Sequence, residues 1–555
     1  MSKALMPVGY DSFEELRSSD FYYVDKSLLV KQLLSKKSMV TLITRPRRFG
    51  KSLNMSMLEC FFDIRKDSKD LFKNLEISKE TEICNKWLNK YPTVFVSFKN
   101  IGGNTYQEAF DSLSTEMSTL FSDYEYLLNS ETVNDVSKRN FNDILNETTS
   151  VNRLKDSLFF LTKLMYSYYN KPVIVLIDEY DVPMSAGNSN GYYEGITNII
   201  RYMLGKVLKG NKYLKIAVLT GCLRISKESI FTGLNNPDID SISDDRYDEY
   251  FGFTDSEVDK LLSDTNLVTH KDIIKEWYDG YHFGDVDVYC PWDVMCYVSR
   301  LLQNPDSKPK PFWANTTGTD IIRPYLHRNR AKISDYFTTL LRGDSVKARI
   351  NERLTYGDLY SNDLDSFWSI LYLTGYLTPT SIDYENNIFE LRIPNKEIKM
   401  IFEESISNWF KNDVVPTSLG EIVSQLWNCE GEKLGTTISK LLFRSISSFD
   451  YSEAFYHAFL AGVLVLTPYD VKSNRENGEG RTDITVIDDE NIRAAVFEFK
   501  IADKKEQLDS KCITALEQID SNKYAEELID KGYTEVLKCG VAFCKKTCKI
   551  KIIRN

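Results

Sequence analysis

Residues 39–52 read MVTLITRPRRFGKS, an apolar run followed by a basic loop that ends in Gly-Lys-Ser. Residues 53–62 continue as LNMSMLECFF, which predicts a buried helix. A strand, a Gly-Lys-Ser loop and a helix form an arrangement that binds phosphate, because N–H groups of the loop and the helix N-terminus point at the anion. The alternative is a surface turn that contains these three residues by chance, and the flanking strand and helix count against it.

The residue types in this loop predict contacts with a nucleotide. Lys51 is expected to reach the outer phosphates and the Ser52 hydroxyl to hold Mg2+. Gly50 allows the backbone to approach the phosphates closely. The usual pattern starts with a glycine, and here Arg45 takes that place. We expect the nucleotide to contact the whole loop, which comprises Arg45, Pro46, Arg47, Arg48, Phe49, Gly50, Lys51 and Ser52.

An acidic pair follows a second apolar run. Residues 173–177 read VIVLI, a continuous apolar run typical of a strand buried on both faces of a parallel sheet. Asp178 and Glu179 come next, at the strand end where α/β sheets bind ligands. We expect Asp178 to hold Mg2+ opposite Ser52 and Glu179 to orient or deprotonate the attacking water. The alternative is a strand that ends in solvated acids.

Two more apolar runs, 93–98 and 214–219, complete the strands of the predicted core. They alternate with helical segments, which predicts an α/β fold with a parallel sheet. Thr220 and Arg224 follow the last run and are candidates to sense the terminal phosphate, although a turn with a surface arginine fits equally well.

These motifs together resemble a known family, the AAA-ATPase-like proteins first catalogued as a domain of unknown function. The resemblance rests on RPRRFGKS (45–52), LIDEYD (176–181) and LTGCLRISKESIFTGLNN (219–236). Arginine in place of the first glycine is part of that family's pattern. The resemblance implies a P-loop ATPase core with Mg–ATP as its ligand. It supports roles for Lys51, Ser52, Asp178, Glu179 and Arg224.

Residues 237–430 are less informative. Aromatic, turn-rich clusters at 277–283 and 289–294 predict core packing of a helical or winged-helix lid, and they are similar to the segment that follows the ATPase core in the same family. A mildly basic stretch at 347–353 fits a solvated helix face as well as it fits nucleic acid.

The C-terminal part predicts a second α/β domain. We expect a helix at 452–460, a hairpin loop at 473–480, and strands at 463–471, 481–487, 494–500 and, last, 536–543. A helix around 515–524 lies between the last two strands.

Acidic and basic residues of this part converge on one predicted sheet face. Glu498 and Lys500 are two apart on a strand and therefore project from the same face. Asp483 on the neighbouring strand can meet them there, and Glu453 can complete a metal shell from its helix. Two carboxylates and a lysine suit metal-assisted phosphodiester hydrolysis, in which Mg2+ lowers the pKa of a bound water. Lys500 would position that water or neutralise developing charge.

The ordered set resembles the PD-(D/E)XK nuclease superfamily, in the subfamily commonly fused behind this ATPase. The motifs are GRTD (480–483) and EFK (498–500), with Thr482 in place of the proline of the superfamily name. The resemblance implies roles for Gln518 and Tyr524 behind the metal site and at the nucleic-acid backbone. The alternative is a sheet edge blunted by charges.

Composition limits the class of protein. The chain has 555 residues, 42% of them hydrophobic, and a net charge of −11. It is long enough for three domains, which we place at 1–236, 237–430 and 431–555. The acidic balance requires any nucleic-acid binding to use a local basic groove. Ten scattered cysteines, no signal sequence and no membrane-length apolar run predict a cytoplasmic protein with reduced thiols.

Three functions fit these observations. The first is an ATP-binding, Mg2+-dependent nuclease that acts on DNA in preference to RNA, as a monomer or a homo-oligomer, in defence or mobile-element handling. The second is a nucleotide-driven switch whose C-terminal domain binds nucleic acid without cutting it. The third is a plain ATPase with a degenerate C-terminal domain. A metal-dependent cleavage assay distinguishes the first function from the second, because only the first yields cleavage products.

Overall fold

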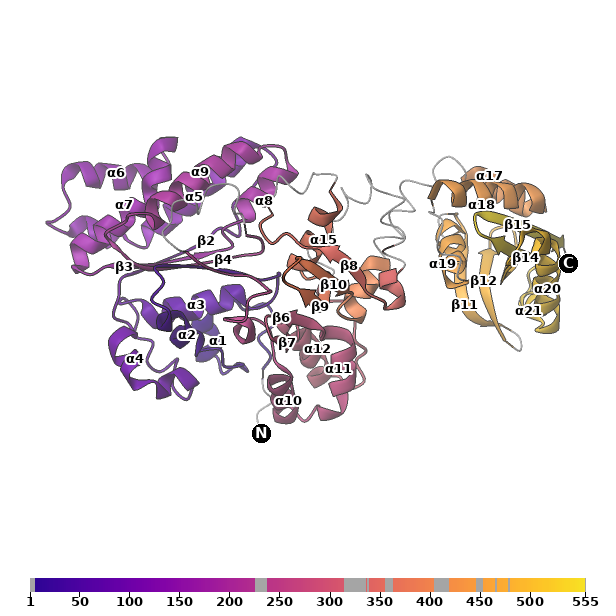
Figure 1. Cartoon of the computed structure of the whole chain (residues 1–555), viewed down its shortest axis with the longest axis horizontal. Helices are drawn as coiled ribbons and strands as arrows, with labels where there is room; N and C mark the ends of the chain where they lie inside the picture. The colour runs from indigo at the N-terminus through magenta and orange to yellow at the C-terminus, as the bar shows by residue number, and fades with distance from the viewer. Residues whose placement is uncertain are drawn as a thin grey trace. The chain divides into compact units, whose positions relative to one another are not determined.

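A computed structural model describes residues 5–224, 237–313, 336, 339–354, 363–403, 419–445, 453–464, 467–477 and 480–554 (Figure 1). The chain forms two compact units. Unit 1 comprises Met1–Ile321 with Ser345–Lys399, and unit 2 comprises Ile322–Asp344 with Met400–Asn555.

Unit 1 is built on a parallel sheet in the order β2-β3-β4-β1-β5. Its strands are β1 (Val40–Thr44), β2 (Thr93–Ser97), β3 (Val173–Asp178), β4 (Leu214–Gly221) and β5 (Asp238–Asp240). The predicted α/β core with a parallel sheet is confirmed. β5 was not expected, because three residues carry no readable periodicity.

Helices cover both faces of this sheet. One face carries α5 (Tyr106–Ser122), α6 (Asp135–Leu145), α7 (Val151–Tyr169), α8 (Val182–Ser189) and α9 (Tyr193–Leu208) (Figure 1). The other carries α1 (Phe13–Ser18), α2 (Leu29–Ser35), α3 (Lys51–Phe62) and α4 (Thr81–Trp87) (Figure 1). β1 and β3 are buried along their whole length, which explains their uninterrupted apolar sequence.

The rest of unit 1 combines helices with small antiparallel sheets. The helices are α10 (Asp255–Asp264), α11 (Lys271–Tyr278), α12 (Pro291–Gln303) and α15 (Leu364–Leu373). β6 (Tyr281–Phe283) and β7 (Val286–Val288) form a hairpin, and β8 (Val346–Arg349), β9 (Thr378–Asp383) and β10 (Ile388–Arg392) form a sheet in the order β8-β10-β9. The basic stretch at 347–353 starts on β8, so the expectation of a helix face there is wrong. Lys347 and Arg349 alternate with buried residues, as the period of a strand requires.

The short β5 is tied to β1 by a buried ion pair. The Arg45 guanidinium contacts Asp240 Oδ1 at 2.6 Å, and both side chains are fully buried. Arg45 also donates to the Ser241 carbonyl at 2.7 Å. Burial raises the pKa of Asp240 to about 6, although Arg45 acts in the opposite direction.

We therefore predict that Asp240→Ala destabilises unit 1 by about 3–5 kcal/mol, because the Arg45 charge stays buried without its partner. Urea unfolding followed by circular dichroism measures the effect. Glu76→Ala, which removes an exposed ion pair with Lys79, is the matched control and should change stability by less than about 1 kcal/mol. If Asp240→Ala unfolds at the same urea concentration as the unmodified protein, water or another group must compensate the buried charge of Arg45.

Unit 2 contains a mixed sheet in the order β11-β12-β13-β14-β15. Only the β13–β14 pair is parallel. The strands are β11 (Asp470–Asn477), β12 (Gly480–Asp488), β13 (Arg493–Ile501), β14 (Glu535–Cys544) and β15 (Thr547–Arg554). The helices are α17 (Leu419–Trp427), α18 (Gly431–Ser445), α19 (Glu453–Leu464), α20 (Leu508–Ser521) and α21 (Tyr524–Asp530). The predicted C-terminal α/β domain is confirmed.

Three expected boundaries in unit 2 are wrong. The segment 463–471 was expected to be a strand, but α19 continues to Leu464 and β11 begins only at Asp470. Most of the expected loop at 473–480 belongs to β11, which ends at Asn477. The strand at 536–543 is not the last, because β15 follows it antiparallel. Apolar runs of this length do not separate a helix end from a strand start.

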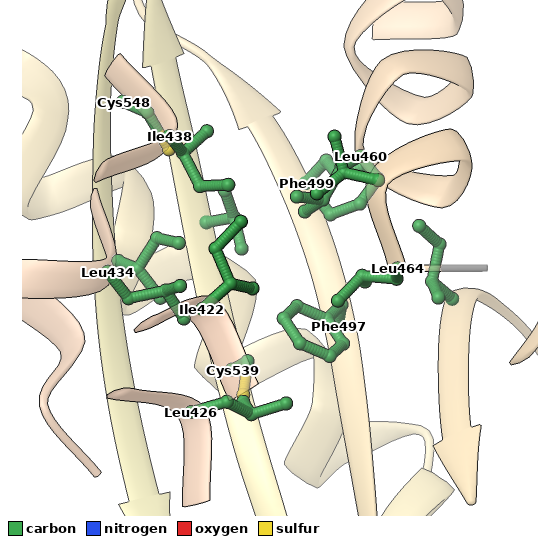
Figure 2. Close-up of a cluster of buried hydrophobic side chains, with 14 of the residues drawn as sticks. Ile422, Leu426, Leu434, Ile438, Leu460, Leu464, Phe497, Phe499, Cys539 and Cys548 are labelled. Atoms are coloured by element: carbon green, nitrogen blue, oxygen red, sulfur yellow. The ribbon is translucent and has the colours of Figure 1, made fainter. Parts of the chain in front are cut away.

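Apolar side chains of β13 point alternately to two cores. Figure 2 shows Phe497 and Phe499 in one cluster with Leu460 and Leu464 of α19. Val496, one position away, belongs to a second cluster with residues of α20 and α21. The sheet of unit 2 is therefore covered by helices on both faces.

Candidate functional site

The Gly-Lys-Ser sequence lies at the N-terminus of α3, as the motif predicts. Gly50 precedes the helix with a φ of +79°, in the left-handed region that glycine adopts without steric cost. Lys51 is the first helical residue and Ser52 the second. The loop therefore presents the positive end of the α3 dipole and its free N–H groups at one place.

The ammonium group of Lys51 is buried among loop carbonyls and acids. Its Nζ donates to the carbonyls of Pro46 at 3.0 Å and Arg45 at 3.2 Å, and it lies 3.3 Å from Glu179 Oε1. Burial alone would lower the pKa of Lys51, but Cys222 and the nearby carboxylates raise it overall. Lys51 is therefore a fixed positive charge at the mouth of the loop.

Ser52 and Asp178 meet directly, although they are far apart in the sequence. Ser52 Oγ donates to Asp178 Oδ2 at 2.7 Å, and Thr220 Oγ1 donates to Asp178 Oδ1 at 2.6 Å. Burial and the Glu179 carboxylate raise the pKa of Asp178. Oxygen atoms bound side by side to Mg2+ are roughly 2.9 Å apart, given Mg–O bonds of about 2.1 Å. The two residues thus fit Mg2+ in donor type and in spacing.

Glu179 occupies an unusual backbone conformation at the end of β3. Its φ is +52°, which is uncommon for a residue with a side chain and is typical of strained functional sites. The conformation turns Glu179 toward Lys51. Asp181 stabilises the neighbouring loop, because its carboxylate accepts the N–H groups of Cys222 and Leu223 at 3.0–3.2 Å. Sequence reasoning assigned Asp181 no role.

Arg224 is half-buried three residues beyond β4. Burial and the nearby Arg353 lower the pKa of its guanidinium. Two arginines that approach each other in a partly buried place favour an anion between them, which keeps Arg224 a candidate for phosphate contact. The remaining residues of that motif, 225–236, lie outside the described residues.

Two side chains of the loop are packed in the protein interior. Arg45 forms a buried ion pair with Asp240, which gives it a structural role. Phe49 is 1% exposed and packs on Tyr281 and Phe283, with ring centroids 4.9 Å away in each case. Phe49 and Arg48 also belong to the wall of the neighbouring cavity, so their predicted ligand contacts stay predictions. Pro46, Arg47 and Arg48 contribute backbone carbonyls to bonds with other residues.

A cavity of about 340 Å³ opens beside the loop and α3. Gly50, Lys51, Ser52 and Glu179 are part of its wall. The wall also contains aromatic and apolar side chains, which include Val8, Tyr10, Tyr22, Tyr23, Val24, Phe253, Trp292 and Met295. A wall that combines cationic and aromatic groups suits a ligand with phosphates and a flat ring.

A second group of predicted residues comes together on the sheet of unit 2. The β12–β13 ladder ends with Ile484 opposite Phe497, which places Asp483 next to the end of the ladder. Asp483 Oδ2 accepts the N–H of Phe499 at 2.8 Å. Lys500 Nζ lies 3.2 Å from Glu498 Oε1, and Glu498 is 3% exposed. Glu498 and Lys500 have the same parity as Val496 and therefore project toward the α20 face.

The remaining predicted residues have different positions. Glu453 begins α19, and its side chain is outside the described residues. Gln518 is half-buried on α20. Tyr524 is 1% exposed within the α20–α21 core, and its hydroxyl accepts from Asn522 at 2.7 Å. This burial counts against a contact of Tyr524 with nucleic acid, and its predicted role behind the metal site stays a prediction.

His457 was missed by the sequence reasoning. Its Nε2 lies 2.7 Å from the Asp483 carbonyl, which joins α19 to the strand of the acidic residue. The spacing of Glu453 and His457, four residues apart on a helix, was the available signal.

Asp483 and Glu498 suit a divalent cation by donor type, since Mg2+ prefers carboxylate oxygens. Among the described residues, no group of three or more His, Cys, Asp or Glu side chains forms a metal cluster. The predicted metal shell that includes Glu453 therefore stays a prediction. No helix in the described part of the chain has the length and hydropathy of a membrane span.

Comparisons with known proteins agree with the two groups of residues. Residues 7–231 match a family model described as predicted AAA-ATPase, and residues 451–552 match a model of the PD-(D/E)XK nuclease superfamily. An "uncharacterized protein in vnfD 5′ region" of Azotobacter chroococcum mcd 1 is 25% identical over 549 residues, which cover 96% of this chain and 94% of that protein. The Walker-type ATPase PABY2304 of Pyrococcus abyssi aligns over 69% of this chain and 96% of its own, with a TM-score of 0.38 and 13% identity. The N-terminal part of the chain thus matches the predicted AAA-ATPase model, and its C-terminal part matches the PD-(D/E)XK nuclease superfamily model.

Proposed function

We propose that this protein is an ATP-binding, Mg2+-dependent nuclease, in which unit 1 binds and hydrolyses ATP and unit 2 cuts DNA in preference to RNA. The observation that carries the proposal is that Lys51 meets Glu179 and Ser52 meets Asp178 beside a cavity of about 340 Å³, whose wall includes Lys51, Ser52 and Glu179. ATP would gate or drive the nuclease. Defence against foreign DNA and handling of mobile elements are processes that suit such a pairing.

The ATP site works through charges held in place before the ligand arrives. Lys51 would exchange its carbonyl partners and Glu179 for the outer phosphates. Ser52 and Asp178 would hold Mg2+, which neutralises charge that develops on the phosphates. Thr220 orients the Asp178 carboxylate for this purpose. Once Lys51 has turned to the phosphate, Glu179 is left to orient the attacking water.

The aromatic side chains of the cavity wall, which include Tyr10 and Tyr22, suit the base. Burial of a purine against them would contribute affinity without hydrolytic chemistry.

Glu179→Gln should separate binding from hydrolysis. The change keeps the shape of the side chain and removes the carboxylate that orients water, so we expect ATP turnover to fall at least about a hundredfold. ATP affinity should stay within about threefold, because Lys51 and Ser52 are untouched. Phosphate release and calorimetry measure the two quantities. Glu131→Gln, an exposed substitution of the same chemistry, is the control. Equal losses of binding and turnover would assign Glu179 a structural role.

The nuclease site uses its three residues in different ways. Asp483 and Glu498 would hold the metal ion that activates water for attack on the phosphodiester. Lys500, already beside Glu498, would neutralise charge on the phosphate in the transition state. Gln518 would support the site from α20.

A second candidate function is a nucleotide-driven switch whose unit 2 binds nucleic acid without cutting it. The observation in its favour is the absence of a third acidic or histidine ligand beside Asp483 and Glu498 in the described residues. Cleavage assays with single-stranded DNA, duplex DNA and RNA, each with and without ATP, distinguish the two. Products that require Mg2+ support the nuclease, and binding without products supports the switch.

We also propose three functional regions, at 1–236, 237–430 and 431–555. All ten cysteines are free thiols, which fits a reducing compartment such as the cytoplasm.

A further inference from the structure

The outer side of the phosphate-binding loop is held by residues from a distant part of the sequence. Trp313 Nε1 donates to the Arg47 carbonyl at 3.5 Å. The Arg48 guanidinium donates to the Phe312 carbonyl at 3.1 Å and lies 4.2 Å from the ring centroid of Trp292. Arg48 also has a φ of +71°, so its backbone needs such support. The shape of the loop therefore depends on the segments around 292 and 313.

These supporting segments are joined by a buried carboxyl pair. Glu397 Oε1 accepts the backbone N–H of Trp313 at 2.6 Å. The side chains of Glu397 and Asp293 are neighbours, Asp293 is one residue from Trp292, and both acids are fully buried. Among the described residues, no N–H or O–H group is in hydrogen-bond geometry with either carboxylate oxygen of Asp293 or with Glu397 Oε2, and the donor next to Asp293 is the Cys290 thiol. A thiol is a weak donor, so the two adjacent acids still need a proton of their own.

Electrostatics leads to the same requirement. Two ionised carboxylates in contact inside a protein repel strongly, and the usual result is that one of them stays protonated. Burial and the Asp293 charge raise the pKa of Glu397, and burial also raises the pKa of Asp293. Arg48 favours ionisation of Asp293 but is shared with Trp292 and Phe312.

The other titratable groups near Asp293 and Glu397 do not change the need for this proton. They are Cys290, Cys296, Tyr278 and Tyr281, each of which is influenced by Asp293 and Glu397. Burial raises the pKa of all four, so they are neutral near pH 7. The Cys290 thiol points at the Arg48 carbonyl at 3.8 Å, which places it on the loop as well.

We propose that Asp293 and Glu397 share one proton and act as positioning residues, which hold the phosphate-binding loop in its binding shape through Trp313 and Trp292. The proposal rests on nucleotide binding at Lys51. Neither acid lines the cavity, so the pair acts through the loop and not on the ligand.

The sign of the pH dependence follows from the direction of these shifts. Because the pKa of Glu397 is raised above its unfolded value, the folded state keeps a proton that the unfolded state has lost. The stabilisation is full in acid and is lost as the pH rises through the raised pKa. Loss of the proton leaves two buried charges in contact, which should separate the supporting segments and loosen the loop.

The test is the affinity of the full chain for Mg–ATP, measured by calorimetry at about pH 7 and about pH 9.5. For the unmodified protein we expect the Kd to rise about tenfold at the higher pH, since a buried charge pair or a lost hydrogen bond costs this much. Glu397→Gln carries a permanent neutral amide that still accepts from Trp313 and can donate to Asp293. Its Kd should change by less than about twofold over the same range.

Glu397→Ala and an exposed control complete the design. The alanine variant leaves the Trp313 N–H and Asp293 without their partner, so its Kd should already be about tenfold higher at pH 7. Glu385→Gln, an exposed substitution, should follow the unmodified protein at both pH values. Glu397→Gln introduces neither a cavity nor a new charge. If Glu397→Ala is unstable, the pH dependence of the Kd of Glu397→Gln therefore tests the proposal by itself.

The proposal is overturned if Glu397→Gln shows the same pH profile as the unmodified protein, or if Glu397→Ala folds and binds ATP normally at pH 7. Failure of the proposed function looks different, because the unmodified protein itself would then bind no ATP at either pH.

Discussion

Replacing Lys51 with alanine should reduce the affinity for Mg–ATP at least about a hundredfold, because the buried Lys51 ammonium group is the charge that pairs with the outer phosphates. The loss should be large because Lys51 is held in place before the ligand arrives, by two carbonyls and Glu179. Its removal also leaves the Glu179 carboxylate facing the phosphates, which adds repulsion. Calorimetry with the full chain measures the effect.

Two controls make this result specific. Lys79→Ala removes an exposed lysine that pairs with Glu76, and it should bind ATP normally. Thermal unfolding without nucleotide checks that the Lys51 variant is folded. Retention of ATP affinity within about threefold in a folded Lys51→Ala variant would contradict the assignment of the loop.

Asp483→Asn and Lys500→Ala should each reduce the rate of Mg2+-dependent cleavage at least about a hundredfold, but for different reasons. The asparagine removes a charge from the metal site and should weaken metal binding. The alanine leaves both carboxylates in place, so metal binding should be kept while charge on the phosphate is no longer neutralised. Isothermal titration with Mn2+ and a cleavage time course separate the two effects.

The double variant should lose no more than either single one, since both residues serve one chemical step. Asp530→Asn, an exposed substitution on α21, is the control for a lost charge in the same unit. If Asp483→Asn cuts as fast as the unmodified protein, unit 2 uses another site or does not cut at all.

The core of unit 1 could be predicted because the same short segments contain both the buried strands and the functional residues. Uninterrupted apolar runs become β1 and β3, and the polar residues that end them meet at one edge of the sheet. The role of Arg45 could not be predicted, because its partner Asp240 lies in a strand of three residues far along the chain.

Unit 2 shows which residues the local pattern can place. Alternation along β13 correctly puts Glu498 and Lys500 on one face, and Asp483 contacts the same strand through the Phe499 N–H. The pattern does not show which side chains the packed helices cover. The burial of Tyr524 in the α20–α21 core was therefore not foreseen. The end of α19 was misplaced for a related reason, since Leu464 lies within the apolar sequence VLVL (463–466), which also suits a strand.

No local sequence pattern indicated that Asp293 and Glu397 form a buried pair. Asp293 belongs to the first turn of α12, where an acid stabilises a helix dipole in any protein. Glu397 follows a Pro-Asn turn and looks like an exposed acid. Only the fold shows that the two are buried together behind Trp313.

The coexistence of two separate sites in one chain is tested most directly by assaying ATP hydrolysis and DNA cleavage side by side. The unmodified protein, Lys51→Ala and Asp483→Asn should be purified in parallel and incubated with Mg2+, ATP and labelled DNA. We predict that Lys51→Ala loses hydrolysis but keeps the cleavage seen without ATP, and that Asp483→Asn loses cleavage but keeps hydrolysis. Loss of ATP hydrolysis in folded Asp483→Asn, or equal cleavage in all three preparations, would contradict the assignment of the two sites.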